Sequence, residues 1–251
     1  MMLARINING HEHEFDLHKP IDVSMPLMAN ENAASAWYVP PISIEPVRTD
    51  QFIGDVNQGG SVNFNAIQFN PHGNGTHTES VGHISSAKES INQCLKTFFF
   101  NAQLISVRPE KQGADFVITK AQVQKELKEN CEAVLIRTLP NNPDKLNRQY
   151  SNSNPPYLES AVIDHFLEKG VNHLLIDLPS VDKEVDDGVL AAHHKFWNYP
   201  DQPQQHRTIT EFIYVPDEVS DGMYLLNIQI APFENDASPS KPVLYKPIDK
   251  S

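Results

Sequence analysis

The sequence predicts a mixed α/β fold with β-rich ends around an α/β centre. In the middle of the chain, short β-branched and aliphatic runs at residues 103–107 and 133–137 flank a helical pattern at residues 119–130. A second helical pattern at residues 157–169 leads into residues 171–177, whose apolar character is that of a buried strand. The later patterns are those of strands, at residues 208–215, 222–229 and 242–245. Strands that alternate with helices and are then followed by further strands indicate a mixed architecture.

Both expected helices have recognisable ends. Thr119 suits an N-cap, because its hydroxyl can accept a hydrogen bond from the first turn. Gly170 is a natural C-terminal stop, because glycine adopts the left-handed conformation easily. The apolar residues expected on one face are Ala121, Val123 and Leu127 in the first helix, and Leu158, Val162, Phe166 and Leu167 in the second.

The N-terminal part of the chain adds weaker strand patterns at residues 3–8, 21–23 and 61–70. The last of these leads directly into a histidine-rich segment. The 251 residues, of which 39% are hydrophobic, have the length and composition of one well-packed unit. We therefore expect a single domain over residues 1–251, in which residues 1–19 form an N-terminal extension that could hold a strand.

The net charge of −12 argues against nucleic acid or an anionic membrane surface as partner, because both would repel the chain. No signal peptide or membrane span is expected, since the longest strongly apolar run without charge covers only residues 97–107. The two cysteines, Cys94 and Cys131, are too far apart in sequence to suggest a disulfide framework or a Cys-x-x-Cys site. These features predict a cytoplasmic protein.

The histidine-rich segment places His72, His77, Glu79 and His83 within twelve positions. In extended backbone His77 and Glu79 point to the same side, so one short strand could offer a metal two ligands. His72 has the wrong parity for a straight strand, but Gly73 and Gly75 can adopt positive φ and bend it back. Imidazoles with a carboxylate suit zinc, manganese or iron. The alternative is that these are polar loop residues that hydrogen-bond a turn.

This segment resembles the signature of the Putative cyclase family, which includes kynurenine formamidases and isatin hydrolases and reads approximately His-x-Gly-Thr-His-x-Asp-x-Pro-x-His. Gly75, Thr76, His77 and His83 match in place. There are three departures: His72 stands one residue too early, Glu79 replaces aspartate, and Val81 replaces proline.

The resemblance continues in a second constellation. Asp177, Ser180 and Asp182 fit an Asp-x-x-Ser-x-Asp stretch, and His193 begins a His-His pair that the family places at the start of a helix. The resemblance implies a catalytic or second-metal role for His193 and for Glu211, beyond a polar insertion at residues 198–206. Alternatively, His193 is a surface residue of its helix and Glu211 a solvated strand residue. Ser180 and Asp182 fit a turn and a helix cap better than a nucleophile and its base.

Further matches at residues 21–27 and 231–239 extend the resemblance from about residue 20 to 246. It implies the cyclase-type swivelling β/β/α fold, a homodimer or homotetramer, and a small-molecule substrate. His72, His77, Glu79 and His83 would bind the metal, zinc being expected before manganese or iron, and His193 and Glu211 would be catalytic. The implied function is metal-dependent hydrolysis of an aryl formamide-like amide, a cyclic amide or a lactone through a metal-activated water. A metal-containing ligand-binding protein and a metal-dependent cyclase or lyase remain alternatives.

Four aromatic residues are candidates for the walls of the substrate site. Trp37, Tyr38, Phe196 and Trp197 could face a flat, apolar substrate or belong to the core.

Overall fold

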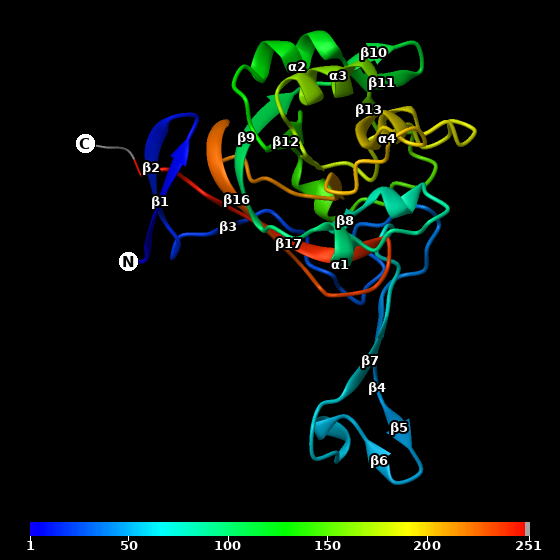
Figure 1. Ribbon diagram of the computed structural model, residues 1–251. Helices are drawn as coiled ribbons and strands as arrows, with labels where there is room; N and C mark the ends of the chain where they lie inside the picture. Colours follow the sequence, from blue (N-terminus) through cyan, green and yellow to red (C-terminus); the bar gives the residue numbers. More distant parts are fainter. Residues whose placement is uncertain (249–251) are drawn as a thin grey trace.

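A mixed eight-stranded sheet forms the body of the molecule in the computed structural model, which describes residues 1–248 (Figure 1). The strand order is β16-β9-β12-β14-β15-β8-β17-β3, and β16 also pairs with β17, so the sheet closes on itself. The strands are β3 (Ile21–Asp22), β8 (His77–Glu79), β9 (Phe99–Val107), β12 (Ala133–Thr138), β14 (His173–Ile176), β15 (Thr208–Glu211), β16 (Gly222–Ile230) and β17 (Ala237–Tyr245). The expected mixed α/β class is confirmed.

The parallel strands at the centre are buried on both faces. β9, β12, β14 and β15 run parallel, and every residue of β12 and of β14 is buried. Along β12, Ala133 and Leu135 face the apolar core enclosed by the sheet, whereas Val134 and Ile136 face the core beneath the helices. This burial explains why the strands read as continuous aliphatic runs in the sequence.

The helices that cover the outer core are short: α2 (Lys120–Glu126), α3 (Ala161–Glu168) and α4 (Ala191–Trp197). Thr119 caps α2 in a capping box with Gln122, as the sequence suggested. α3 begins later than predicted, because Tyr157 and Leu158 pair with β11 as the short strand β13. Gly170 has φ +83° just after α3 and ends it. α1 (Ile91–Cys94) is a single turn, and its Ile91 packs in the core enclosed by the sheet.

Smaller sheets decorate the body. β1 (Leu3–Ile8) and β2 (His11–Asp16) form an antiparallel hairpin, so the N-terminal extension holds the expected strand and a second one. Its Ile8 and Phe15 pack with Leu225 of β16. β10 (Glu110–Gln112), β11 (Asp115–Ile118) and β13 (Tyr157–Leu158) form another small sheet. Within residues 1–248, no helix has the length and apolar character needed to cross a membrane.

A narrow arm, residues 43–68, stands away from the body (Figure 1). Its stem pairs β4 (Ser43–Pro46) with β7 (Asn65–Gln68), and its tip pairs β5 (Arg48–Thr49) with β6 (Phe52–Ile53) and includes the turn η1 (Val56–Gln58). The strand predicted over residues 61–70 is therefore wrong except for β7, because residues 61–64 turn back into the tip. The prediction of a single domain over residues 1–251 includes residues 249–251, which lie outside the described part.

One buried ion pair ties the loop after β12 to the end of β14. The Lys145 ammonium donates to Asp177 at 2.7 Å and to the Thr138 carbonyl at 2.6 Å, and both charged side chains are at most 4% exposed. Burial raises the pKa of Asp177, and the ammonium of Lys145 opposes that rise. Without Lys145, the carboxylate would be a buried charge without its cation.

We expect Lys145→Met to lower the free energy of unfolding by about 3–5 kcal/mol, because it leaves Asp177 uncompensated. The matched control is Lys195→Met, which removes an exposed pair with Asp164 of the same 2.7 Å length. That control should cost at most about 1 kcal/mol. Urea unfolding of the two variants tests this, and equal losses would contradict the structural role given to Lys145.

Candidate metal centre

β8 carries the centre of the site. His77 and Glu79 are completely buried in this strand, which lies between β15 and β17. The register sets Glu211 of β15 opposite His77. His77 Nε2 therefore lies 4.0 Å from Glu79 Oε2 and 3.5 Å from Glu211 Oε2. The prediction that His77 and Glu79 project to the same side agrees with this geometry.

His72 reaches the same point from the turn before β8. Its Nδ1 lies 3.1 Å from Glu79 Oε2. Gly75 has φ +132°, so one of the two predicted glycine bends is present. Gly73 is needed for a different reason: a Cβ there would lie 2.5 Å from a methyl group of Val39 and 2.9 Å from the Ala36 carbonyl oxygen. The displaced histidine of the family signature is thus brought into the cluster.

His83 and His193 complete the ring around Glu79. His83 ends the short turn η2 (Val81–His83), and its Nδ1 lies 3.7 Å from Glu79 Oε2. His193 lies in the first turn of α4, with Nε2 3.2 Å from Glu79 Oε1 and 3.9 Å from Glu211 Oε1. The structure therefore brings together all six residues proposed from the sequence: His72, His77, Glu79, His83, His193 and Glu211.

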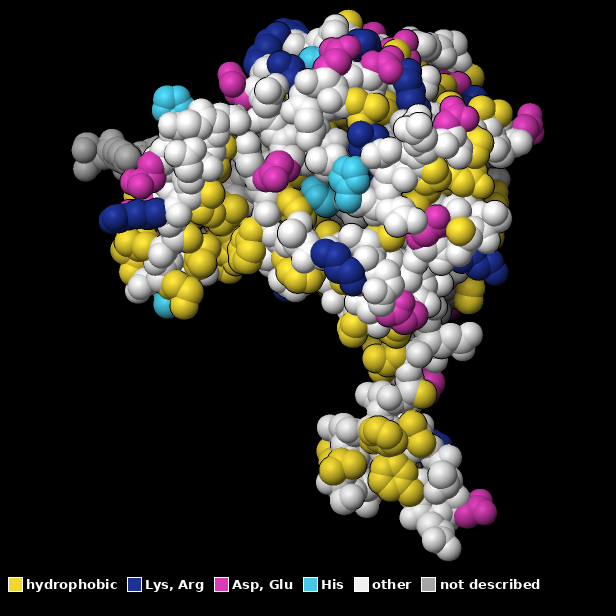
Figure 2. Space-filling view, in the orientation of Figure 1, with side chains coloured by type: hydrophobic (Ala, Val, Ile, Leu, Met, Phe, Trp, Pro, Cys, Tyr) yellow, Lys and Arg dark blue, Asp and Glu magenta, His cyan; other side chains and the backbone are white. Residues whose placement is uncertain are grey.

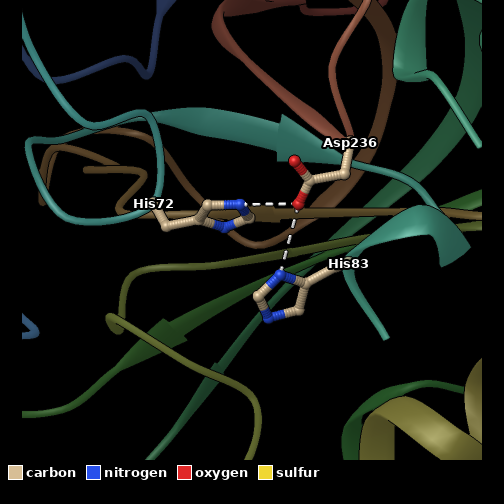
Figure 3. A group of neighbouring side chains, drawn as sticks. All are labelled: His72, His83 and Asp236. Carbon is tan, nitrogen blue, oxygen red and sulfur yellow. Dashed lines mark hydrogen bonds and ion pairs between the residues drawn. The ribbon is translucent and has the colours of Figure 1, made fainter. Parts of the chain in front are cut away.

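Asp236 is a member of the cluster to which the sequence assigned no role. It precedes β17, and its Oδ2 lies 2.8 Å from His72 Nε2 and 3.4 Å from His83 Nδ1 (Figure 3). His72 and Asp236 are 164 positions apart, so spacing could not connect them. The available signal was its place within residues 231–239, one of the segments that match the family.

Three imidazoles share one arrangement, in which an outer acceptor holds one nitrogen and the other faces Glu79. His72 Nε2 donates to Asp236 at 2.8 Å, and His77 Nδ1 donates to the Gly75 carbonyl at 3.0 Å. His193 Nδ1 donates to Asp182 at 2.6 Å. Asp182 also accepts the backbone N–H groups of Ala192 and His193, so it caps α4, as expected, and orients the imidazole. Outer acceptors of this kind fix the tautomer and direction of metal-binding histidines.

The inner atoms fit a divalent cation. Among residues 1–248, His77 Nε2 and both carboxylate oxygens of Glu79 are buried without a hydrogen-bond partner. Such groups are costly to bury unless something else compensates them. The potential ligand atoms of His72, His77 and Glu79 lie within 4.8 Å of one another, as do those of Glu79, His83 and His193. A set of imidazole nitrogens and carboxylate oxygens suits zinc, manganese or iron.

The charges of the cluster also favour a bound cation. Burial disfavours protonated His72 and His193, but their carboxylate partners outweigh it and raise the pKa of each histidine to about 10. Burial opposes ionisation of Glu79 and Asp236, yet the neighbouring histidines lower the pKa of both carboxyl groups. The carboxylates thus attract positive charge, which protons or a metal ion can supply.

A cavity of about 400 Å³ opens onto this cluster. Its inner lining includes His72, His83, His193 and Glu211. Its apolar walls are Trp37, Val39 and Leu190, and its polar lining comprises Asn70, Ser180, Lys183, Glu184 and Asp186. Tyr38 is 69% exposed, and Phe196 and Trp197 are fully buried core residues, so Trp37 is the aromatic wall. His194 points elsewhere and contacts the Tyr199 carbonyl.

Comparison with known proteins gives a family. Residues 15–183 match the sequence model of the family described as Putative cyclase. A kynurenine formamidase from Bacillus cytotoxicus is 30% identical over 227 residues, which cover 89% of this chain and 96% of the relative. One from Bacillus anthracis is 28% identical over 233 residues, covering 90% and 97%. The chain belongs to the Putative cyclase family.

Solved structures share the fold. A potential metal-dependent hydrolase with cyclase activity has a TM-score of 0.65 at 15% identity, covering 90% of this chain and 97% of its own. Isatin hydrolase A from Labrenzia aggregata, bound to benzyl benzoate, has a TM-score of 0.64 at 15% identity, covering 90% and 93%. The expected cyclase-type fold is confirmed.

The metal-free protein should lose stability as the pH rises from about 6.5 to about 10. His72 and His193 have raised pKa values, so their contribution is fully present below the unfolded value of 6.5 and is lost through about 10. Bound metal should reduce this loss, because it would replace the proton of His72. Urea unfolding of chelator-treated protein with and without zinc tests both statements. In His193→Gln the pH slope should be shallower, and an unchanged slope would contradict the assignment.

Asp236→Asn should weaken metal binding by about 10–100-fold, because it removes the carboxylate that holds Nε2 of His72 and so directs its Nδ1 toward Glu79. Asp186→Asn is the matched control, since Asp186 lines the cavity but its carboxylate accepts, within residues 1–248, only the backbone N–H groups of Gly188 and Leu190. Competition with a metal-binding dye measures both affinities. Similar affinities for the two variants would count against the orienting role.

Proposed function

We propose that this chain is a metal-dependent hydrolase that cleaves a non-peptide C–N bond, in an aryl formamide-like substrate or a cyclic amide, with lactones as a related substrate class. The observation that carries the proposal is the buried Glu79 carboxylate, which accepts no well-aligned hydrogen bond and is ringed by histidine nitrogens beside an open cavity. The names of the kynurenine formamidase relatives support the C–N bond.

The proposed metal ligands are His72, His77 and Glu79, with His83 as a further ligand. We propose zinc, with manganese or iron as alternatives. When bound, such an ion would polarise a substrate carbonyl and lower the pKa of water. His83 is 31% exposed at its side chain, against at most 20% for the other three histidines of the cluster. It is therefore the imidazole best placed to meet both the cluster and the substrate.

His193 and Glu211 are the proposed proton-transfer pair, or ligands of a second ion. Asp182 holds Nδ1 of His193, so Nε2 is the atom that gains or loses a proton. Glu211 Oε1 accepts the Val181 backbone N–H at 3.0 Å, which leaves Oε2 facing His77. Hydrolysis of an amide needs one proton taken from water and one delivered to the leaving nitrogen, and two such groups can share these tasks.

The cavity walls favour a flat and partly apolar substrate. Trp37 and Tyr38 both have positive φ, +61° and +55°. This left-handed conformation costs free energy in residues other than glycine. Tyr38 is held by hydrogen bonds to Ser151 and Asn152, which keep the adjoining Trp37 at the cavity. The aromatic face of Trp37 can stack on an aryl ring.

The activity is tested with the purified protein, by elemental analysis and by turnover of N-formyl aryl amides, isatin-like lactams and lactones. We expect a stoichiometric divalent metal and hydrolysis of at least one class. Metal without turnover would favour a ligand-binding protein, and conversion without consumption of water would favour a cyclase or lyase. A purified protein that contains no divalent metal and whose melting temperature is unchanged by a chelator would contradict the metal proposal.

Variants separate the site from the fold. His77→Ala should lower kcat/KM by at least about 1,000-fold and reduce the bound metal, because it removes a buried ligand. Glu211→Gln should lower kcat by about 100-fold or more through lost proton transfer. His194→Ala, next to the site on α4 but outside the cluster, is the control and should stay within about threefold of wild type. Full activity of His77→Ala would contradict the proposed site.

A further inference from the structure

Glu184 joins two of the loops that border the cavity. It lies between Asp182 and α4 and lines the cavity itself. Its Oε1 accepts the backbone N–H of Asn152 at 2.5 Å, and its Oε2 accepts that of Asn154 at 2.9 Å. One carboxylate therefore holds a second loop, 32 and 30 positions away in the chain, through both of its oxygens.

The loop that Glu184 holds has an unusual backbone. Asn152 and Asn154 have φ of +61° and +45°, in the left-handed region. Asparagine visits this region more readily than most residues, but only at single positions. Backbone N–H groups in such turns can converge on an anion. The carboxylate of Glu184 is that anion here, so it stabilises the turn in the conformation observed.

The same loop supports the aromatic wall of the cavity. The Tyr38 hydroxyl donates to Asn152 Oδ1 at 2.7 Å, and the Tyr38 backbone N–H donates to Ser151 Oγ at 2.9 Å. Trp37 precedes Tyr38, and both have the positive φ that needs support from the surrounding structure. The tip of the arm stands clear of the body and gives no such support in a single chain (Figure 2). Hydrogen bonds thus connect Glu184, through residues 151–152, to the segment that carries Trp37.

A second anchor holds both sides of this contact. Lys183, next to Glu184, donates to Asp115 Oδ2 at 2.8 Å, and the Asn154 side chain donates to Asp115 Oδ1 at 2.9 Å. Asp115 begins β11. The segment that carries Glu184 and the loop that it binds are therefore fixed at the same end of this strand.

Asp186 shows how a carboxylate of the same segment acts when its contacts are local. It also accepts two backbone N–H groups, but they belong to Gly188 and Leu190 of its own loop. The contacts of Glu184 differ because they join this segment to the one that supports Trp37.

We propose that Glu184 is a positioning residue for substrate binding, which keeps Trp37 in place as the wall against which an aryl group of the substrate packs. Its hydrogen bonds go to Asn152 and Asn154 and not to the metal cluster, so its loss should affect binding and leave the chemical step intact. The nature of the bound group rests on the proposed function. The support that Glu184 gives to Trp37 does not depend on that function.

Steady-state kinetics with the aryl substrate that wild type hydrolyses fastest tests the role in binding. Glu184→Ala should raise KM by at least about tenfold, because it removes two hydrogen bonds to a charged group, and should leave kcat within about threefold of wild type. Glu184→Gln keeps one acceptor oxygen and should raise KM less. The matched control is Glu159→Ala, which removes a carboxylate that accepts the Lys120 backbone N–H from 39 positions away and does not line the cavity. Its KM and kcat should equal those of wild type.

Tryptophan fluorescence tests the position of Trp37 without any substrate. The chain has two tryptophans, and Trp197 is fully buried, so quenching by acrylamide reports on Trp37, which is half-buried. Glu184→Ala should raise the quenching constant by about twofold, because the segment that carries Trp37 opens locally. Glu159→Ala should leave the quenching constant unchanged.

Unchanged quenching or an unchanged KM in Glu184→Ala would overturn the proposal, and so would a loss of bound metal or a fall in kcat at constant KM. Circular dichroism checks that each variant is folded, and Glu184→Gln carries the same test if Glu184→Ala does not fold. A wild type that hydrolyses none of the substrates would contradict the proposed function instead. Quenching would still show whether Glu184 holds Trp37.

Discussion

The buried carboxylate of Glu79 is the constraint on which the site depends. It lies in β8 with no exposed surface and, among residues 1–248, accepts no well-aligned hydrogen bond, while nitrogen atoms of His72, His77, His83 and His193 lie 3.1–4.0 Å from its oxygens. A carboxylate in such surroundings needs a compensating positive charge. The outer acceptors Asp182 and Asp236, together with the Gly75 carbonyl, hold the imidazoles in the orientation that a cation requires.

The closed sheet is what allows residues from five segments to meet there. β8 runs antiparallel to both neighbours, and its register with β15 sets His77 opposite Glu211. The segment before β17 brings Asp236 to the same place. The loop after β14 carries Asp182, which holds both the start of α4 and its His193. The buried pair of Lys145 and Asp177 secures the beginning of this same loop. The stability of the sheet at the carboxyl end of β14 and the geometry of the site therefore depend on the same segments.

Sequence patterns predicted the features that local chemistry determines. The buried strands, the Thr119 cap, the Gly170 stop and the shared side of His77 and Glu79 follow from periodicity and residue type. The sequence assigned no role to Asp236 because its partners are distant in the chain. It predicted a backbone bend at Gly73, whereas a glycine is required there because a Cβ would clash with Val39. The strand expected at residues 61–70 failed because alternation alone does not separate a buried strand from an exposed arm.

Anomalous diffraction from crystals grown with zinc tests the central claim most directly. The account predicts a peak within about 2.0–2.2 Å of His72 Nδ1, His77 Nε2 and a Glu79 oxygen, the usual zinc distances to nitrogen and oxygen. Peaks that avoid Glu79, or an empty cluster with its imidazoles hydrogen-bonded only to the surrounding carboxylates, would contradict it.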